Sequence, residues 1–383
     1  MLKKHIKILV VAPEYPYPAN DGGKVDVFRR LQTLYKIGYE VDFLYTSKAR
    51  ISNYHPISEY CDEIYYTPKI LNLKYLFSMI PFQVLSRKSL KNIQISKDYD
   101  WILLEGDHVS EVLLNKKIKT KNGYLLRVNN IERDFFFEQF KGGFPSLKSI
   151  YALSESIKYG FYSSKIYKLC KYLLFVSSKE LETIERKYKV DGVHLLSHYA
   201  KENAVKRPLN SKKILFIGSL TLPSNVEGLK WYLNNIHPLL QDIDDYEFIV
   251  AGSTNPKESR TRIEDFVLSF ENVKIYTNLS DLDDMYEQCS IFVNPVQRGA
   301  GIKVKSINAI QNGLPLVSTS IGIEGMGVCN EKHVLIADSI DKFEKNIRRL
   351  LDNKELREDL SENAQMYFSS INHEDILSKI LEK

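Results

Sequence analysis

The chain has 383 residues, which is more than one hydrophobic core usually supports, so its length predicts two domains. Hydrophobic residues make up 44% of the chain and charged residues 26%, which is the composition of an ordinary globular protein. The net charge of +5 comes from 53 basic and 48 acidic residues and is too small to indicate a nucleic-acid partner, so we exclude one.

Cysteine and hydrophobic patterns exclude further classes. The cysteines have no CxxC spacing and no neighbouring histidine pair, so they predict neither a zinc site nor a disulfide framework. The N-terminal apolar run is too short for a secretory signal, and no stretch reaches the roughly 18 consecutive apolar residues of a membrane span. We therefore expect a cytoplasmic protein, and peripheral contact with the inner face of a membrane stays open.

Apolar, strand-like runs alternate with amphipathic segments from the N-terminus onward. Strands are expected at residues 6–12, 41–46, 101–105, 124–128 and 172–177. Strands that are almost continuously apolar and alternate with helices indicate a parallel sheet covered on both faces. This pattern predicts a Rossmann-like domain at residues 1–200.

The loop after the first strand ends in Gly22 and Gly23, directly before a helical pattern that contains Val27, Leu31 and Leu34. Glycines at a helix N-terminus let an anion approach the backbone N–H groups at the positive end of the helix dipole. A long turn with a helix cap explains the same residues equally well.

Residues 64–97 contain six lysines or arginines and no acidic residue, together with leucines and aromatic residues. Such a segment is typical of contact with an anionic membrane or with a lipid-linked phosphate. A packed helix with a basic outer face is the more common explanation.

Glu105, Asp107 and His108 follow the third predicted strand, where side chains of a parallel sheet meet a ligand. His108 is a candidate proton carrier or hydrogen-bond donor to a hydroxyl group. A loop histidine without a chemical task is an equal alternative.

A second polar run, Arg127, Asn129, Asn130 and Glu132, follows the next strand. An N-capping Asn130 is the simplest explanation of part of this run.

The strand pattern restarts after a polar, basic linker at residues 201–212. Strands are expected at residues 213–218, 246–252, 273–277, 291–295 and 314–319. They predict a second Rossmann-like domain at residues 213–369, followed by a C-terminal helix at residues 370–383 that either caps this domain or crosses back to the first one. The expected fold class is therefore α/β, with two Rossmann-like domains facing a central cleft and the ligand beyond the carboxyl ends of the strands.

Gly218 ends the first strand of this second domain, and Asn225 is expected to cap the helix that follows. The loop between them either binds a phosphate or simply connects the two elements.

The most specific stretch, RGAGIKVKSINAIQNGLPLVSTSIGIEG, occupies residues 298–325. Gly299, Ala300 and Gly301 leave room for close approach to the backbone, and a helix is expected at residues 302–311.

Lys303 and Lys305 lie at the start of this helix, with Asn308 on the same face as Lys305. The helix dipole disfavours cations at this end, so two lysines there indicate a bound anion, with a solvated helix start as the alternative. The GxxxxGK[ST] spacing of a P-loop is absent.

Three segments together resemble the retaining glycosyltransferases of the GT-B fold, of the group 1 or family 4 type. They are FIGSLTLPSNVEGLKWYL, IVAG, and DLDDMYEQCSIFVNPVQRGAGIKVKSINAIQNGLPLVSTSIGIEG. The resemblance extends to the N-terminal APEYPYPANDGG loop and the RVNNIE segment, and so over essentially the whole chain.

The resemblance implies a nucleoside-diphosphate sugar as donor substrate, with no metal or other cofactor. It also implies that the C-terminal helix at residues 370–383 crosses back to the first domain, as in other proteins of the GT-B fold. We assign a catalytic role to Lys303, Lys305 and His108. The implied donor-binding residues are Gly22, Gly23, Gly218, Thr277, Asn278, Leu279, Gly299, Ala300, Gly301, Ile302 and Asn308. The residues assigned to the acceptor side are Glu105, Asn129 and Asn130.

The chain departs from the family pattern at several positions. Gln297 and Arg298 precede the glycine turn where relatives carry a glutamate, and Asn308 replaces a second glutamate expected to contact the ribose. Asn129 stands where relatives often carry a histidine. An amide accepts a hydrogen bond less strongly than a carboxylate, so these positions predict altered donor choice or rate.

The expected function is retaining transfer of a sugar to a saccharide or lipid-linked acceptor during assembly of a surface polysaccharide or glycolipid. Two alternatives stay open. One is a sugar-nucleotide 2-epimerase of the same fold, and the other is a catalytically degenerate partner subunit.

Overall fold

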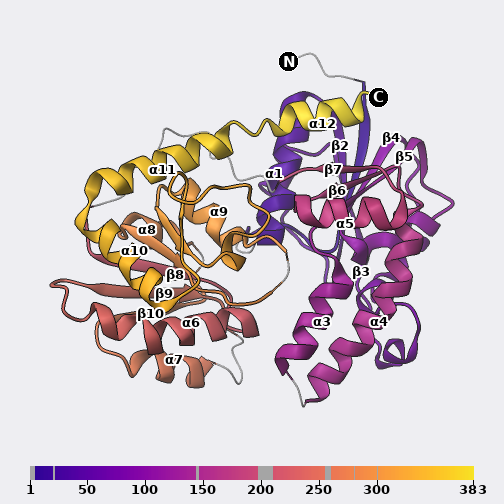
Figure 1. The fold of residues 1–383 in the computed structure, drawn as a ribbon. Helices are drawn as coiled ribbons and strands as arrows, with labels where there is room; N and C mark the ends of the chain where they lie inside the picture. Colours follow the sequence, from indigo (N-terminus) through magenta and orange to yellow (C-terminus); the bar gives the residue numbers. More distant parts are fainter. Residues whose placement is uncertain are drawn as a thin grey trace. The chain divides into compact units, whose positions relative to one another are not determined.

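The computed structural model of the protein describes residues 5–19, 22–143, 146–196, 210–254, 260–279, 281–299 and 301–383. It divides into two compact units, of which unit 1 comprises Met1–His198 with Asn372–Lys383, and unit 2 comprises Tyr199–Ile371. Each unit is a parallel sheet flanked by helices (Figure 1). The predicted α/β class with two Rossmann-like domains is therefore confirmed. Among the described residues, no helix is both long and apolar enough to cross a bilayer.

Unit 1 contains a seven-stranded sheet in the order β3-β2-β1-β4-β5-β6-β7. Its strands are β1 (Lys7–Ala12), β2 (Glu40–Ser47), β3 (Glu63–Pro68), β4 (Asp98–Glu105), β5 (Lys119–Val128), β6 (Tyr172–Phe175) and β7 (Gly192–His194). The sequence interpretation missed β3 and β7, the two edge strands. β3 is only half-buried and mixes polar with aromatic residues, and β7 has three residues, so neither shows the continuous apolar run of a central strand.

The helices of unit 1 are α1 (Gly22–Ile37), α2 (Phe82–Leu85), α3 (Glu132–Gly143), α4 (Leu147–Tyr167), α5 (Ser178–Tyr188) and α12 (His373–Leu381). Short 3-10 turns are η1 (Ile57–Glu59), η2 (Leu73–Phe77), η3 (Lys88–Lys91) and η4 (Asp107–Leu114). The basic segment at residues 64–97 is thus not one packed helix. It consists of β3 and three short helical turns, because Pro68 and Pro81 prevent a continuous helix there.

Helix α12 belongs to unit 1 although it is the last element of the chain. It begins at His373, three residues later than expected, because the Asn372 side chain caps it by accepting from the Asp375 N–H. The side chains of Leu377 and Leu381 join the buried core around β1 and β2. The Trp101 indole donates to the carbonyl of Leu381 at 2.9 Å.

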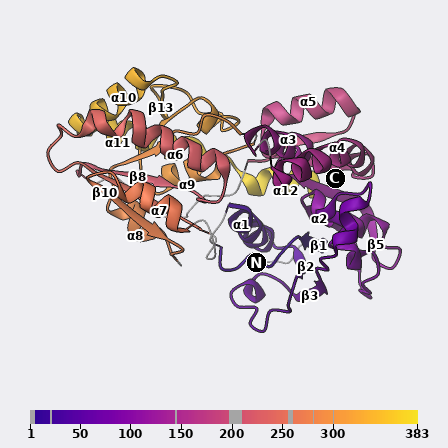
Figure 2. The same ribbon diagram turned by 90° about the horizontal axis from the view of Figure 1, so that it is seen from below.

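Unit 2 contains a six-stranded sheet in the order β10-β9-β8-β11-β12-β13. Its strands are β8 (Lys213–Ile217), β9 (Glu247–Gly252), β10 (Val273–Thr277), β11 (Ile291–Asn294), β12 (Leu316–Ser318) and β13 (Leu335–Ile336). Its helices are α6 (Pro223–Asn235), α7 (Arg260–Leu268), α8 (Asp283–Glu287), α9 (Val304–Gln311), α10 (Ile340–Asp352) and α11 (Lys354–Ser369), with 3-10 turns η5 (His237–Leu240) and η6 (Ile321–Ile323). Helices lie on both sides of this sheet (Figure 1, Figure 2).

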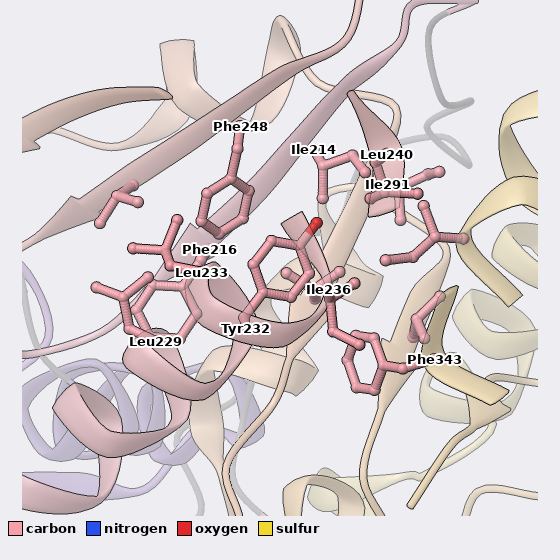
Figure 3. Packing of buried hydrophobic residues seen from close by; sticks show 14 of the residues in the cluster. Ile214, Phe216, Leu229, Tyr232, Leu233, Ile236, Leu240, Phe248, Ile291 and Phe343 are labelled. Atoms are coloured by element: carbon pink, nitrogen blue, oxygen red, sulfur yellow. The ribbon is translucent and has the colours of Figure 1, made fainter. Parts of the chain in front are cut away.

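The core of unit 2 forms where α6 and α10 meet the sheet. Tyr232 of α6 stacks on Phe248 of β9 with ring centroids 4.4 Å apart, and it meets Phe343 of α10 edge-on (Figure 3). This packing anchors α6, the helix that follows β8, and so fixes the loop at the carboxyl end of β8. Of the predicted linker, residues 201–209 lie outside the described part of the chain.

Candidate functional site

The strand order of unit 2 creates a topological switch point between β8 and β11. From β8 the chain proceeds outward to β9 and β10, and it then returns to place β11 on the other side of β8. Connections therefore leave the carboxyl ends of β8 and β11 in opposite directions, and ligands of open α/β sheets bind at such a point. The two helices that follow these strands are α6 and α9.

Lys305 of α9 lies at this switch point. Its ammonium donates to the Asn225 side-chain oxygen at 2.8 Å and lies 4.6 Å from the centroid of the Phe216 ring. The Asn225 amide nitrogen in turn donates to the carbonyl of Ser219 at 3.0 Å. Asn225 therefore positions the lysine, and does not cap α6 as expected, because α6 already begins at Pro223.

Burial, and then the neighbouring charge of Lys303, lowers the pKa of Lys305 to about 7. No acidic partner compensates the ammonium in the bonds described above. A negatively charged ligand would stabilise the protonated form and raise this pKa. The site therefore places the Lys305 ammonium, without an acidic partner in these bonds, where an anion can bind.

The glycine turn before α9 is closed by Lys303. The Lys303 ammonium donates to the carbonyl of Gly299 at 3.0 Å and to that of Gly301 at 2.5 Å. Gly299 and Gly301 have φ values of 123° and 74°, which favour glycine. Helix α9 begins at Val304, so Lys303 occupies the N-cap position, and not the first turn as expected.

No side chain of the described residues caps α9, so the first backbone N–H groups of this helix keep their capacity to bind an anion. Ile302 is half-buried between the turn and the helix. Ala300 lies outside the described residues.

Arg298 connects the same glycine turn to α6 through an ion pair. Its guanidinium forms a two-pronged ion pair with Glu227. A side chain at Gly299 would come within 3.8 Å of Ser224, so the turn runs close to the start of α6. Sequence reasoning noted Arg298 only as a replaced glutamate and missed its pairing with Glu227, since the two residues lie 71 positions apart.

Gly218 is required by the close approach of Asn225. A Cβ atom at position 218 would lie 2.9 Å from the Asn225 amide nitrogen, and a larger side chain would displace it. Because Asn225 holds Lys305, Gly218 acts on the site through this contact.

Unit 1 places Glu105 in a buried cluster of four charges and not at a surface. Both Glu105 oxygens accept from Arg30, which also pairs with Asp26, and Asp26 pairs with Arg127. Glu105 is only 1% exposed. Both oxygens of its carboxylate are therefore bonded to Arg30 inside the protein. This burial argues against the acceptor-side assignment of Glu105.

A second polar cluster in unit 1 surrounds His108, at the carboxyl ends of β4 and β5. His108 Nε2 lies 3.6 Å from the Glu132 carboxylate, which is beyond hydrogen-bond reach. Among the described residues, neither His108 Nε2 nor the buried Tyr159 hydroxyl has a hydrogen-bond partner. The Asp107 carboxylate is buried and accepts from the Ser163 hydroxyl at 2.8 Å.

Comparison with known proteins places this geometry in a family. A family model described as "Glycosyl transferases group 1" matches residues 211–353, which contain the switch-point site. A Klebsiella pneumoniae protein named "Uncharacterized 44.6 kDa protein in cps region" is 32% identical over 356 residues, which cover 89% of this chain and 90% of that protein.

Two solved structures share the fold over nearly the full length of both chains. A variant of S. aureus TarM, solved in complex with Fondaparinux, alpha-GlcNAc-glycerol and UDP, superposes with a TM-score of 0.69 at 12% identity, covering 98% of this chain and 99% of that one. WaaG, a glycosyltransferase involved in lipopolysaccharide biosynthesis, superposes with a TM-score of 0.65 at 14% identity and covers 98% of both chains.

The chain belongs to the group 1 glycosyltransferases. Its fold is the GT-B type that TarM and WaaG share.

In this glycosyltransferase Asn308 lies half-buried on α9, one turn after Lys305. Its side chain makes no hydrogen bond with the part of the chain that the structure describes, since the bonds at Asn308 all involve its carbonyl. It thus keeps its capacity to bind a ribose hydroxyl, and the assignment stays a prediction.

The expected base-binding residues after β10 differ in availability. The Asn278 side chain is bonded to the backbone and hydroxyl of Thr254, both at 2.9 Å, and Thr277 donates to Glu264 at 3.0 Å. Asn278 therefore joins the loops that follow β9 and β10, and Thr277 joins the end of β10 to α7. Asn278 and Leu279 are both exposed, and because the Asn278 side chain is bonded to Thr254, Leu279 is the remaining candidate for contact with a base.

On the unit 1 side of the enzyme, Gly22 and Gly23 form the first turn of α1 and do not precede it. Asn130 does not cap α3, because the chain places Ile131 directly before Glu132, the first residue of the helix, and the Ile131 carbonyl accepts the first helical bonds. The side chains of Asn129 and Asn130 make no hydrogen bond to a described residue, so both stay candidates for the acceptor side.

Asp107→Asn is expected to change the pH dependence of stability. Burial, and then the charge of Glu132, raises the pKa of Asp107 to about 7. The folded protein holds this proton where the unfolded chain has lost it, so the stabilisation is complete below about pH 4 and is lost as pH rises toward 7. The free energy of unfolding of the Asn variant relative to wild type should therefore increase by roughly 2 to 3 kcal/mol between about pH 5 and 8.

Urea denaturation of both proteins at each pH measures this difference. Glu111→Gln on the same 3-10 turn is the control, because that carboxyl carries a smaller upward shift. A difference that does not change with pH would contradict the role of Asp107.

Proposed function

We propose that the protein transfers a sugar from a nucleoside-diphosphate sugar to an acceptor hydroxyl, with retention of configuration. The observation that carries the proposal is the Lys305 ammonium, held by Asn225 and Phe216 at the switch point beside a glycine turn and an uncapped helix start. The acceptor is a saccharide or a lipid-linked saccharide, and the product belongs to a surface polysaccharide or glycolipid.

The chemistry of the reaction fits this arrangement. Breaking the bond between the sugar and the diphosphate leaves additional negative charge on the diphosphate. Positive groups aimed at that charge stabilise the transition state more than the ground state. Lys305 and the N–H groups at the start of α9 supply such groups without a metal ion, and Lys303 keeps the glycine turn in shape around the phosphates.

The comparisons support the substrate classes of this proposal. TarM was solved with UDP and a GlcNAc derivative, and WaaG functions in lipopolysaccharide biosynthesis. The Klebsiella relative lies in a cps region. These properties support a nucleotide-sugar donor and a role in surface polysaccharide assembly on the cytoplasmic side, where nucleotide sugars are made.

Residues of unit 1 complete the proposal. Among the described residues, the buried His108 Nε2 atom has no hydrogen-bond partner, and it serves as a hydrogen-bonding or proton-carrying group for a sugar hydroxyl. Asn129 and Asn130 bind the acceptor.

A 2-epimerase requires a base that removes a proton from the sugar. Of the two carboxylates that the sequence places beside His108, Glu105 is bonded to Arg30, and Asp107 is buried against Ser163. Their engagement favours the transferase over the epimerase.

The test incubates the protein with each member of a panel of nucleotide sugars, without an acceptor. Two quantities are measured, the release of nucleoside diphosphate and the identity of the sugar products. We expect binding and slow hydrolysis of one donor class. A folded sample that binds no donor would exclude the proposal, and interconversion of two sugar nucleotides would establish the epimerase.

A further inference from the structure

Helix α4 of unit 1 carries a row of exposed apolar side chains, Leu147, Ile150, Ile157 and Phe161. Leu147 is 87% exposed and Phe161 is 64% exposed. At about 3.6 residues per turn these positions share one face, opposite the buried Ala152 and Tyr159. In the part of the chain that the structure describes, the row is therefore an apolar face without a partner, and not the edge of the core.

A second exposed apolar group lies on the segment beside this helix. It comprises Leu73, Phe77 and Met79, of which Phe77 is 91% exposed. The segment is attached to α4, because the Lys158 ammonium donates to the carbonyl of Leu76 at 2.9 Å and the Phe82 ring meets Tyr151 edge-on.

The two groups border each other. On the helical wheel, Tyr151 and Lys158 lie about a quarter turn from the exposed row of α4. The segment at residues 76–82 packs against that side, so its outward side chains flank the row. We call the seven exposed residues the α4 surface: Leu73, Phe77, Met79, Leu147, Ile150, Ile157 and Phe161.

Exposed lysines on the two segments that carry the α4 surface have no acidic partner among the described residues. Five exposed lysines form no ion pair with a described residue: Lys74, Lys88, Lys148, Lys165 and Lys168. Residues 64–97 contain no acid, and the one acid of α4, Glu155, is buried and bonded to Lys158. On the adjacent helix α3, which lies beside α4 in Figure 1, Glu138 pairs with Lys141 and Asp134 with Arg133.

We propose that the α4 surface docks this protein onto a membrane containing anionic lipid. Phenylalanine and leucine side chains enter the boundary between headgroups and acyl chains, and lysines around them contact the lipid phosphates. Protein interfaces, in contrast, are depleted in lysine, so the charge pattern favours a lipid surface over a second copy of this chain. The inference goes beyond the transfer reaction and does not depend on it.

The experiment is sedimentation of the full chain with vesicles of phosphatidylcholine alone or with about one quarter phosphatidylglycerol. We expect binding to the anionic vesicles that weakens with added salt. The variant Phe77→Ser, Ile157→Ser, Phe161→Ser should lose at least about tenfold in partition, since three inserted apolar side chains are removed. The variant Lys148→Glu, Lys165→Glu should lose about fivefold or more per lysine.

The matched control is Leu268→Ser, Met366→Ser, which removes two exposed apolar side chains of unit 2 and should bind as wild type does. Circular dichroism and donor binding establish that each variant is folded. Absence of binding to anionic vesicles at low salt, or equal binding by the triple variant, would overturn the proposal. If the wild type does not bind vesicles, is a dimer in sedimentation velocity and becomes a monomer with the triple substitution, the α4 surface mediates self-association instead.

Discussion

Replacing both Lys303 and Lys305 by alanine is expected to weaken donor binding by roughly 2 to 4 kcal/mol, or about 30- to 700-fold in Kd. In the proposed reaction Lys305 supplies the charge for the diphosphate, and Lys303 bonds to the carbonyls of the glycine turn beside it. Titration calorimetry with UDP and with the preferred nucleotide sugar measures the loss.

The control is Lys230→Ala, because the Lys230 ammonium lies over the Phe266 ring at 5.1 Å in a similar cation–π contact on another part of unit 2. It should bind the donor as wild type does. Wild-type affinity in the double variant would refute the site. Unchanged polymer assembly in cells carrying the double variant would instead favour a degenerate partner subunit.

The low pKa of Lys305 adds a pH dependence to this result. Without ligand the pKa is about 7, so above neutral pH the lysine must take up a proton when it binds a diphosphate. Donor affinity should therefore fall between about pH 7.5 and 9, by at most about tenfold per pH unit. Lys305→Arg should remove this dependence, because arginine stays charged throughout the range.

Leu377→Ala in α12 is expected to destabilise unit 1 by roughly 2 to 5 kcal/mol, the cost of truncating a buried leucine. The side chain is fully buried among residues of β1, β2 and α1, so its removal leaves a cavity. Since a domain is stable by only about 5 to 15 kcal/mol, deletion of residues 372–383 should leave unit 1 largely unfolded.

Each unit contains one of the two tryptophans, so the fluorescence of a single tryptophan can follow the unfolding of one unit. Trp101 lies in unit 1, where its indole donates to Leu381, and Trp231 lies in unit 2. In a Trp231→Phe background, fluorescence during urea unfolding reports unit 1 alone. Lys379→Ala, an exposed change on the same helix, is the control, and a Leu377→Ala midpoint equal to that control would contradict the anchoring role of α12.

Local pattern predicted most of the fold. The central strands of both sheets were placed correctly, because their apolar runs and the helices between them are properties of neighbouring residues. Edge strands β3, β7 and β13 were missed, since half-buried or very short strands lack that signal. The start of α9 was misplaced by two residues, because the Lys303 side chain and the glycine turn, and not a capping residue, set it.

The candidate site was predicted in part. The glycine turn and the two lysines could be recognised locally, because glycines and cations before a helical pattern indicate an anion wherever they occur. The role of Asn225, the pairing of Arg298 with Glu227 and the burial of Glu105 could not be recognised in this way. Each joins residues that are far apart in the chain.

The sequence by itself therefore determined the α/β class, since apolar runs and helical patterns depend on spacing along the chain, and its resemblance to the group 1 glycosyltransferases indicated the family. That residues 298–325 meet an anion stays a prediction. Only the tertiary structure shows that the Lys305 ammonium donates to Asn225, which lies 80 positions away in the chain, and that it lies over the Phe216 ring. That contact exists because β11 returns to pair with β8 after β9 and β10 have been added on the other side. Strand order is a result of packing the whole sheet, and it brings Asn225 and Phe216 to Lys305.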